Sequence, residues 1–144
     1  MATSLVPYLF FSGRCDEAIE FYRHAIGAKL VMRMGFDESP EPVPEGMLQA
    51  GFETKVMHAS MQIAEATIFL SDSCDDKPKF DGFRLALSVD NEQDAHRIFD
   101  GLADGGTIDM PLTKTFWSPC YGMVTDRFKV LWMVMVPGEH PPQQ

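Results

Sequence analysis

The two halves of this chain repeat the same order of secondary-structure patterns. Residues 5–11 form an apolar strand pattern, residues 12–28 have helical spacing, and three more strand patterns follow before residue 73. One strand, one helix and three strands then come again between residues 83 and 136. The repeat predicts an α+β chain built from two βαβββ modules, one in each half.

Both predicted helices carry signals for their ends. Gly27 stands where the first helix needs a residue that tolerates a positive φ angle. Asp90 and Gln93 resemble a capping arrangement at the start of the second helix, and Gly105 and Gly106 end it. Apolar residues recur at helical spacing between these signals, so each helix should cover one face of a sheet.

The strand patterns of residues 56–63 and 67–72 predict a hairpin whose two faces differ. If the turn centres on Ala64 and Glu65, Ile63 lies opposite Ala66 and alternation fixes the rest. One face is then mostly polar: His58, Ser60, Gln62, Thr67, Phe69 and Ser71. The other is apolar and should lie under a helix: Met57, Ala59, Met61, Ile63, Ile68 and Leu70. A polar, partly aromatic face of this kind would suit the wall of a cavity.

The charge of the chain excludes some classes of partner. Its 21 Asp and Glu residues against 12 Lys and Arg give a formal net charge of -9. Such a field repels phosphate backbones and anionic lipids, so we expect binding to neither nucleic acid nor membranes. The N-terminal residues lack a secretory signal pattern, and no apolar run nears the roughly 20 residues that span a bilayer. We therefore expect a cytoplasmic protein.

The cysteines predict neither a disulfide framework nor a zinc site. Cys15, Cys74 and Cys120 are odd in number and lack CxxC spacing, which indicates free thiols. Cys15 lies near the start of the first helix, where the helix dipole could lower its pKa, and Cys120 could serve as a nucleophile. No histidine stands near Cys120 in the sequence to activate it, so we interpret both thiols as structural.

Five stretches of the sequence match a known pattern: PYLFF, DEAIEFYRHAIGA, VMHASMQI, FLSD and TFWSPCYGMVTDRFKVLW. In these stretches the chain resembles the PhnB-like family of the vicinal oxygen chelate superfamily, which includes glyoxalases, bleomycin-resistance proteins and dioxygenases. The resemblance covers about residues 5–136, and its TFW, GxVxDxF and VxW elements, in that order, are specific to the family.

The resemblance implies a fold and an assembly. The two modules, about residues 5–72 and 83–136, would form a single domain of residues 1–144 with the vicinal oxygen chelate fold. In that fold an open, mostly antiparallel, barrel-like sheet surrounds a cavity, and members of the family are usually homodimers. We therefore expect a homodimer with a small-molecule ligand as its other partner.

The superfamily's enzymes hold a divalent metal with His and Glu side chains on the first, fourth, fifth and eighth strands. The matching positions in this chain are Tyr8, either Phe69 or Ser71, Arg84 and Met133. An arginine repels a cation and a thioether binds a hard divalent ion poorly, so this set does not make the usual site. We expect no metal ligands at these positions and no cofactor, while a divalent metal bound elsewhere stays open.

The residues at and around these positions predict a ligand pocket instead. Its aromatic and soft members are Tyr8, Phe10, Phe69, Trp117, Tyr121 and Met133. Its polar anchors are His58 and Arg84, and Arg84 would select a carboxylate, phosphonate or phenolate. His58 is also the best candidate for a general base, but we favour its interpretation as a hydrogen-bonded cavity histidine without chemistry.

Two aspartates and one lysine predict local backbone features. Asp72 and Asp126 end strands in the two halves, and we interpret both carboxylates as acceptors of backbone hydrogen bonds in the following turns. The family often has glycine where Lys129 stands, so the same turn would give this lysine an unfavourable positive φ angle.

Three functions are consistent with the sequence. We favour a metal-free small-molecule-binding protein of PhnB type whose ligand is an aromatic or anionic metabolite. The first alternative is a metal-dependent enzyme of the superfamily with an atypical site, using His58 and an acidic residue of residues 37–46. The second is a drug-sequestering resistance protein, which the basic Arg84 disfavours for a cationic drug. A methyltransferase is not supported, because no glycine-rich loop follows the first strand.

Overall fold

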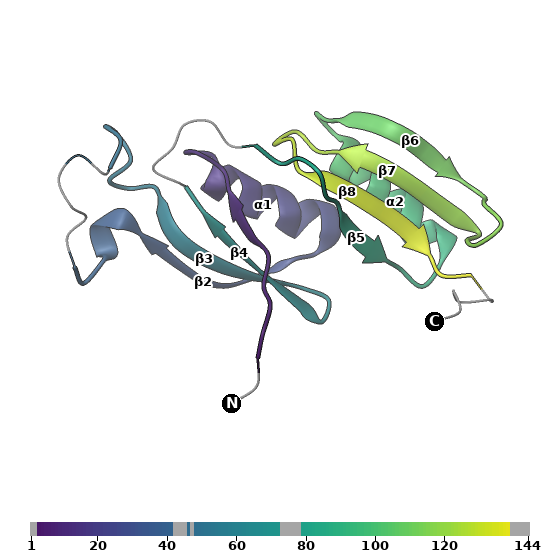
Figure 1. Cartoon of the computed structure of the whole chain (residues 1–144), viewed down its shortest axis with the longest axis horizontal. Helices are drawn as coiled ribbons and strands as arrows, with labels where there is room; N and C mark the ends of the chain where they lie inside the picture. Colours follow the sequence, from purple (N-terminus) through teal and green to yellow (C-terminus); the bar gives the residue numbers. More distant parts are fainter. Residues whose placement is uncertain (1–2, 42–45, 47, 73–78, 139–144) are drawn as a thin grey trace. The chain divides into compact units, whose positions relative to one another are not determined.

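The chain folds as two compact units, Met1–Pro78 and Lys79–Gln144, in a computed structural model. The structure describes residues 3–41, 46, 48–72 and 79–138. In this part, each unit has one α-helix and four strands in the order βαβββ (Figure 1). The predicted α+β class with two βαβββ modules is confirmed. That residues 1–144 act as a single domain stays a prediction.

The first unit is a four-stranded sheet with one α-helix. Its elements are β1 (Tyr8–Phe10), α1 (Cys15–Ile26), β2 (Lys29–Gly35), the short 3-10 helix η1 (Phe36–Glu38), β3 (Val56–Ile63) and β4 (Ala66–Ser71). The strands lie in the order β1-β4-β3-β2. Strand β1 runs parallel to β4, and the other neighbours are antiparallel.

The second unit has the same topology. Its elements are β5 (Leu85–Ser88), α2 (Glu92–Ala103), β6 (Thr107–Thr113), β7 (Cys120–Thr125) and β8 (Leu131–Val136). The strand order is β5-β8-β7-β6, with β5 parallel to β8 and the other neighbours antiparallel. Both sheets are therefore mostly antiparallel, as the resemblance to the family implied.

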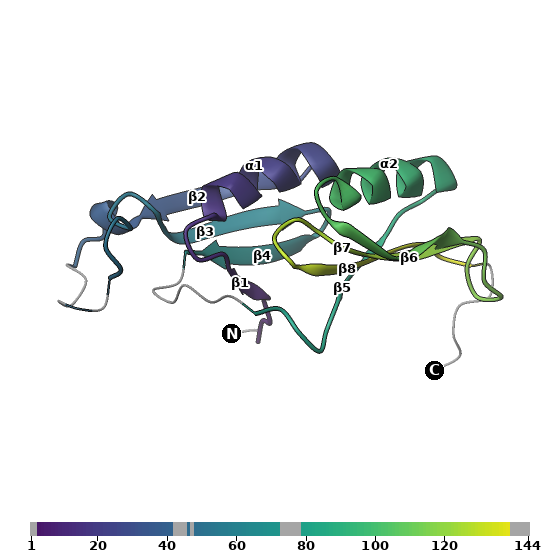
Figure 2. The ribbon, with the colours of Figure 1, turned by 90° about the horizontal axis from the view of Figure 1, so that it is seen from above.

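One face of the first sheet is covered by α1 (Figure 2). The helix buries one stripe of side chains: Cys15, Ala18, Ile19, Tyr22 and Ala25. Buried strand residues of the same unit are Leu9, Ala59, Met61, Ile63, Ile68 and Leu70. Gly27 ends the helix with a φ angle of 68°, and the amide of Ala28 donates to the carbonyl of Tyr22 at 3.2 Å.

The β3–β4 hairpin has the predicted register. Ile63 pairs with Ala66, and Ser60 pairs with Phe69, so side chains that alternation placed together do share a face. The tight turn requires a φ angle of 53° at Ala64. His58 and Phe69 consequently lie on the face of the sheet that α1 does not cover.

The start of α2 differs from the predicted capping pair of Asp90 and Gln93. Asn91 is the N-cap, and its side chain accepts a hydrogen bond from the amide of Asp94 at 2.8 Å. Asparagine and aspartate cap equally well, so the sequence left the choice between neighbouring residues open. Among the helices that the structure describes, none is long and apolar enough to cross a membrane.

Asp72 connects three parts of the first unit. Its carboxylate is fully buried and accepts hydrogen bonds from the amides of Gly13 at 2.6 Å and Cys15 at 2.8 Å. Its second oxygen accepts from the amide of Val56 at 2.9 Å. The prediction of backbone hydrogen bonds is correct, but these donors lie at the start of α1 and of β3 rather than in a following turn. Asp72 therefore holds α1 against the sheet.

Asp126 follows β7, at the turn into β8. One carboxylate oxygen accepts from the amides of Phe128 at 2.8 Å and Val130 at 3.1 Å. The other accepts from the indole nitrogen of Trp132 at 2.9 Å. All of these contacts are local, and Asp126 thus fixes the turn from β7 into β8 as predicted.

The same turn places Lys129 at a φ angle of 75°, as predicted from its position. A left-handed conformation costs a residue with a Cβ atom roughly 1–2 kcal/mol relative to glycine. We expect Lys129→Gly to raise the free energy of unfolding by about 1 kcal/mol, after the entropy that glycine gains in the unfolded chain. Urea denaturation measures this change. Lys129→Ala is the control, because it removes the same charge but keeps the strain; equal effects of both variants would contradict the prediction.

Candidate functional site

The face of the first sheet that α1 leaves open carries a cluster of rings, here called the aromatic face: Tyr8, Phe10, His58 and Phe69. Strand β1 pairs with β4 so that Tyr8 lies beside Phe69, and β3 supplies His58. The rings of Tyr8 and Phe10 stack at 4.9 Å with an interplanar angle of 9°. Both residues are 43% exposed, so the stacked pair presents aromatic surface to solvent.

A short hydrogen bond joins Tyr8 and His58 within the aromatic face. The phenol oxygen of Tyr8 lies 2.7 Å from Nδ1 of His58. Burial raises the pKa of Tyr8, while a hydrogen bond with Ser71 lowers it by less. The phenol is therefore protonated at neutral pH. In the tautomer whose Nδ1 accepts from this O–H, the ring proton of His58 is on Nε2 and can be donated to a ligand.

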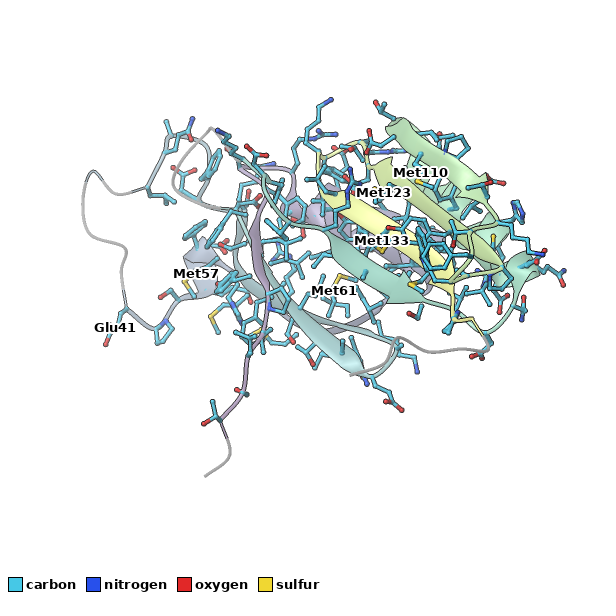
Figure 3. All side chains as sticks on the ribbon, turned by 45° about the vertical axis from the view of Figure 1, so that its right-hand side comes forward. Glu41, Met57, Met61, Met110, Met123 and Met133 are labelled. Carbon is cyan, nitrogen blue, oxygen red and sulfur yellow. The ribbon has the colours of Figure 1, made fainter. Side chains whose placement is uncertain are left out.

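The open face of the second sheet carries a methionine face, defined by Met123, Met133 and Met135. Met123 pairs with Met133, and Met135 pairs with Tyr121 on the neighbouring strand. The three methionines are half-buried. Figure 3 shows Met110, Met123 and Met133 on the ribbon of this unit. Flexible thioether side chains adapt to ligands of different shapes, so this face is a soft apolar surface.

Arg84 stands just before β5 and already has partners. Its Nη1 donates to the carbonyl of Trp132 at 3.0 Å, and its Nη2 lies 3.2 Å from Oδ2 of Asp109. The hydroxyl of Thr125 donates to the same oxygen at 2.6 Å. The predicted role of Arg84 as an anion anchor stays a prediction, but an anion here would meet a carboxylate that occupies part of the guanidinium.

Sequence reasoning missed Asp109. It lies between Ile108 and Met110, where the register of β6 and β7 shifts. Simple alternation of faces fails at such an irregularity, so the side-chain direction of Asp109 does not follow from the sequence. The sequence offered no signal for its pairing with Arg84, because β5 and β6 are the two edges of the sheet, with β8 and β7 between them.

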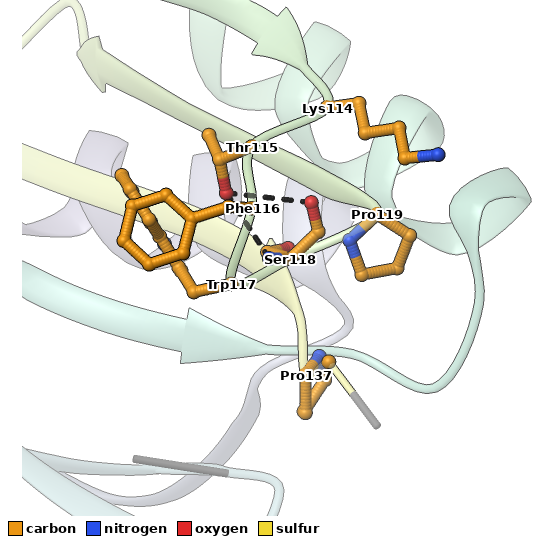
Figure 4. A pocket seen from close by; sticks show the side chains of 8 residues that line it. Lys114, Thr115, Phe116, Trp117, Ser118, Pro119 and Pro137 are labelled. Carbon is orange, nitrogen blue, oxygen red and sulfur yellow. Dashed lines mark hydrogen bonds between the residues drawn. The ribbon is translucent and has the colours of Figure 1, made fainter. Parts of the chain in front are cut away.

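A hollow of about 330 Å³ lies in the second unit, at the loop between β6 and β7 (Figure 4). Its lining residues are Lys114, Thr115, Phe116, Trp117, Ser118, Pro119, Pro137 and Gly138. The rings of Phe116 and Trp117 meet edge to face at 4.6 Å, and Phe116 is 95% exposed. The amide of Ser118 donates to the Thr115 hydroxyl at 3.1 Å, which holds the loop in shape.

The predicted pocket residues fall into two groups. Tyr8, Phe10, His58 and Phe69 form the aromatic face of the first unit. The others belong to the second unit: Arg84, Trp117, Tyr121 and Met133. Trp117 is 39% exposed beside the hollow, whereas Tyr121 is buried and contacts it with ring centroids 5.4 Å apart. That all eight residues bind one ligand stays a prediction.

The positions that match the superfamily's metal ligands do not fit a hard divalent ion. Tyr8 is hydrogen-bonded to His58, and the hydroxyl of Ser71 donates to the carbonyl of Met57 at 2.7 Å. Arg84 is cationic, and the remaining position offers a thioether. Residues 3–41, 46, 48–72 and 79–138 contain no group of three or more His, Cys, Asp or Glu side chains that could hold a metal ion. The side chains at these positions therefore do not form a site for such an ion, and we derive no reaction step through a metal there.

The thiols differ from one expectation. Cys15 is buried in the first turn of α1, and burial raises its pKa far above the ordinary value, helped by the nearby charge of Asp72. The alternative of a pKa lowered by the helix dipole is not supported, because desolvation of the thiolate outweighs the dipole. Burial also raises the pKa of Cys120. Both thiols are buried, in agreement with a structural role, and Cys74 lies outside the described residues.

Known proteins share this arrangement of paired modules. The sequence profile of the Glyoxalase/Bleomycin resistance protein/Dioxygenase superfamily matches residues 4–134. The chain belongs to this superfamily. Protein YjdN of Escherichia coli K12 is 37% identical over 96% of this chain and 99% of its own length. The resemblance seen in the sequence motifs is thereby confirmed.

Solved structures of superfamily relatives have the same fold. Protein PA1353 from Pseudomonas aeruginosa is 36% identical, with a TM-score of 0.81 over 96% of this chain and 100% of its own. A Bacillus cereus protein, named a putative 3-demethylubiquinone-9 3-methyltransferase and PhnB protein, superposes with a TM-score of 0.77. It is 23% identical and covers 93% of this chain and 99% of its own. At this identity, the second likeness concerns the fold of the superfamily rather than an activity.

Proposed function

We propose that this superfamily member is a small-molecule-binding protein of PhnB type that needs no metal ion. Its ligand would be an aromatic or anionic metabolite. The observation that carries the proposal is the aromatic face, where two stacked rings lie exposed beside a hydrogen-bonded histidine. The proposal includes a homodimer in the cytoplasm that binds neither nucleic acid nor membrane.

The aromatic face supports binding for an energetic reason. Tyr8 and Phe10 already stack on each other at the surface of the sheet, so a flat ligand can extend the stack on the outer ring face of Phe10 without a change in the protein. Such aromatic contacts contribute roughly 0.5–1.5 kcal/mol beyond the apolar area that they bury. The Nε2 proton of His58 then offers a donor to one acceptor atom of the ligand, which would fix the ligand's orientation.

The chemistry of the matching metal positions supports the metal-free part of the proposal. Three of the four side chains there are a phenol already used by His58, a guanidinium and a thioether. Hard divalent ions prefer carboxylate and imidazole ligands over these groups. His58 is the one imidazole on the aromatic face, and a single imidazole does not make a metal site. The metal-free proposal does not depend on whether His58 acts as a general base.

The test combines metal content with ligand binding. We expect untagged protein, purified without chelators, to contain far less than one transition metal per chain by inductively coupled plasma mass spectrometry. A metabolite that raises the melting temperature should do so equally with and without EDTA. One metal per chain, or binding that EDTA abolishes, would overturn the metal-free proposal.

A variant pair locates the site. Phe10→Leu should weaken binding of that metabolite about tenfold, since one stacking surface is lost. Phe83→Leu is the matched control, because Phe83 is 49% exposed and lies outside the aromatic face. Isothermal titration calorimetry measures both, and equal affinities of the two variants would show that the aromatic face is not the site.

A further inference from the structure

The ion pair of Arg84 and Asp109 lies among uncharged residues of the second sheet. The ion pair lies on the same side of this sheet as the three residues of the methionine face. The residues that strand pairing places on this face, from β5 to β8, are Ala86, Ser88, Thr107, Met110, Thr113, Tyr121, Met123, Thr125, Leu131, Met133 and Met135. None of them is charged, so Arg84 and Asp109 together set the local charge.

We propose that Asp109 is a specificity-determining residue, which makes this face accept uncharged apolar ligands and reject anions. The inference rests on the proposed small-molecule binding and narrows the ligand class from aromatic or anionic to uncharged and aromatic. Asp109 acts as a resident counter-ion of Arg84, so the guanidinium no longer presents a net positive charge to a ligand.

Two features hold Asp109 in this role. Its Oδ2 accepts from the Thr125 hydroxyl at 2.6 Å while it faces Nη2 of Arg84 at 3.2 Å. The guanidinium is itself held by the carbonyl of Trp132 at 3.0 Å. The Arg84 and Asp109 side chains are only 24% and 31% exposed, so water screens the pair less than a surface ion pair.

An anionic ligand would have to displace Asp109 or lie beside its negative charge. A like charge within a few ångströms in a partly buried site costs roughly the equivalent of tenfold in affinity. An uncharged ring meets no such cost and gains contact with the methionine side chains. The face therefore discriminates by charge even though it contains an arginine.

Two dyes with the same ring system test this proposal. Anilinonaphthalene sulfonate is anionic, and N-phenylnaphthylamine is its uncharged counterpart without the sulfonate. We expect the protein to bind the uncharged dye more tightly, measured by dye fluorescence at constant ionic strength. Asp109→Asn should tighten binding of the anionic dye about tenfold and leave that of the uncharged dye unchanged.

Two further variants control for net charge and for the partner. Asp104→Asn removes the same charge and also breaks an ion pair, since Asp104 lies 3.2 Å from Arg127, but neither residue is on this face. It should change neither affinity. The double variant Arg84→Gln/Asp109→Asn should lose the tighter binding of the anionic dye, because the guanidinium freed from Asp109 is what attracts that dye.

The outcomes separate the inference from the function on which it rests. The proposed role of Asp109 is wrong if both dyes bind and Asp109→Asn changes neither affinity. It is also wrong if Asp104→Asn tightens binding of the anionic dye as much as Asp109→Asn does. In both cases small-molecule binding by the protein stands. If neither dye binds to the unmodified protein, this face of the second sheet is not a binding surface and the inference is wrong, while the proposed binding at the aromatic face is decided separately by the Phe10→Leu variant.

Discussion

Asp72→Asn is expected to lower the free energy of unfolding by about 3 kcal/mol, because it replaces a buried acceptor of three hydrogen bonds. The carboxylate accepts from the amides of Gly13, Cys15 and Val56. An asparagine has one oxygen in place of two, and its NH₂ group would face at least one backbone N–H. At least one buried donor would thus lose its partner.

Guanidinium denaturation, followed by circular dichroism, measures this loss. Asp100→Asn is the matched control, since Asp100 is exposed on α2 and the substitution changes the net charge equally. It should alter stability by less than about 0.5 kcal/mol. A comparable loss in both variants would mean that charge, rather than the hydrogen bonds of Asp72, is responsible.

The second large effect is expected for Trp132→Phe. Trp132 is buried, and its indole N–H donates to Asp126 at 2.9 Å. A phenylalanine removes this bond to a charged group and leaves unfilled volume, which together should cost about 3 kcal/mol. Trp117→Phe is the control, because Trp117 is 39% exposed, and it should cost under about 1 kcal/mol.

A double-mutant cycle assigns the loss in Trp132→Phe to its cause. If the hydrogen bond matters, Trp132→Phe and Asp126→Asn together should destabilise the chain by clearly less than the sum of the two single changes. Additive effects would show that the cost of Trp132→Phe comes from packing alone. Each tryptophan variant also leaves a single indole, so fluorescence reports unfolding separately at Trp117 and Trp132.

The repeated sequence pattern predicted the fold class because its signals are local. Helical spacing and strand alternation depend on neighbouring residues, and Gly27 marks a helix end through its own backbone preference. The hairpin register followed from the turn at Ala64, since a short turn fixes all later pairs. These features needed no knowledge of distant contacts.

The features that were missed or wrong depend on distant contacts or on irregular backbone. Asp109 projects from a register shift, where alternation gives no direction for a side chain. The pKa of Cys15 depends on burial and on Asp72, which is 57 residues away in the sequence. The helix dipole was the only influence visible locally, and it is the weaker one here. Asp72 was correctly predicted to accept backbone hydrogen bonds. Its contact with the start of α1 could not be predicted, because the residues next to it in the sequence carry no information about that helix.

The two buried aspartates imply two different ways of reaching native contacts. Asp126 binds donors that are 2, 4 and 6 residues away, so its hydrogen bonds can form as soon as one turn closes. Asp72 joins donors that are 16, 57 and 59 residues away, and these bonds need nearly the whole module to come together first. Closing the longer loops costs more chain entropy before any contact is gained. The turn around Asp126 can thus act as a local nucleus for its hairpin, whereas the hydrogen bonds of Asp72 can form only late, once its module has come together.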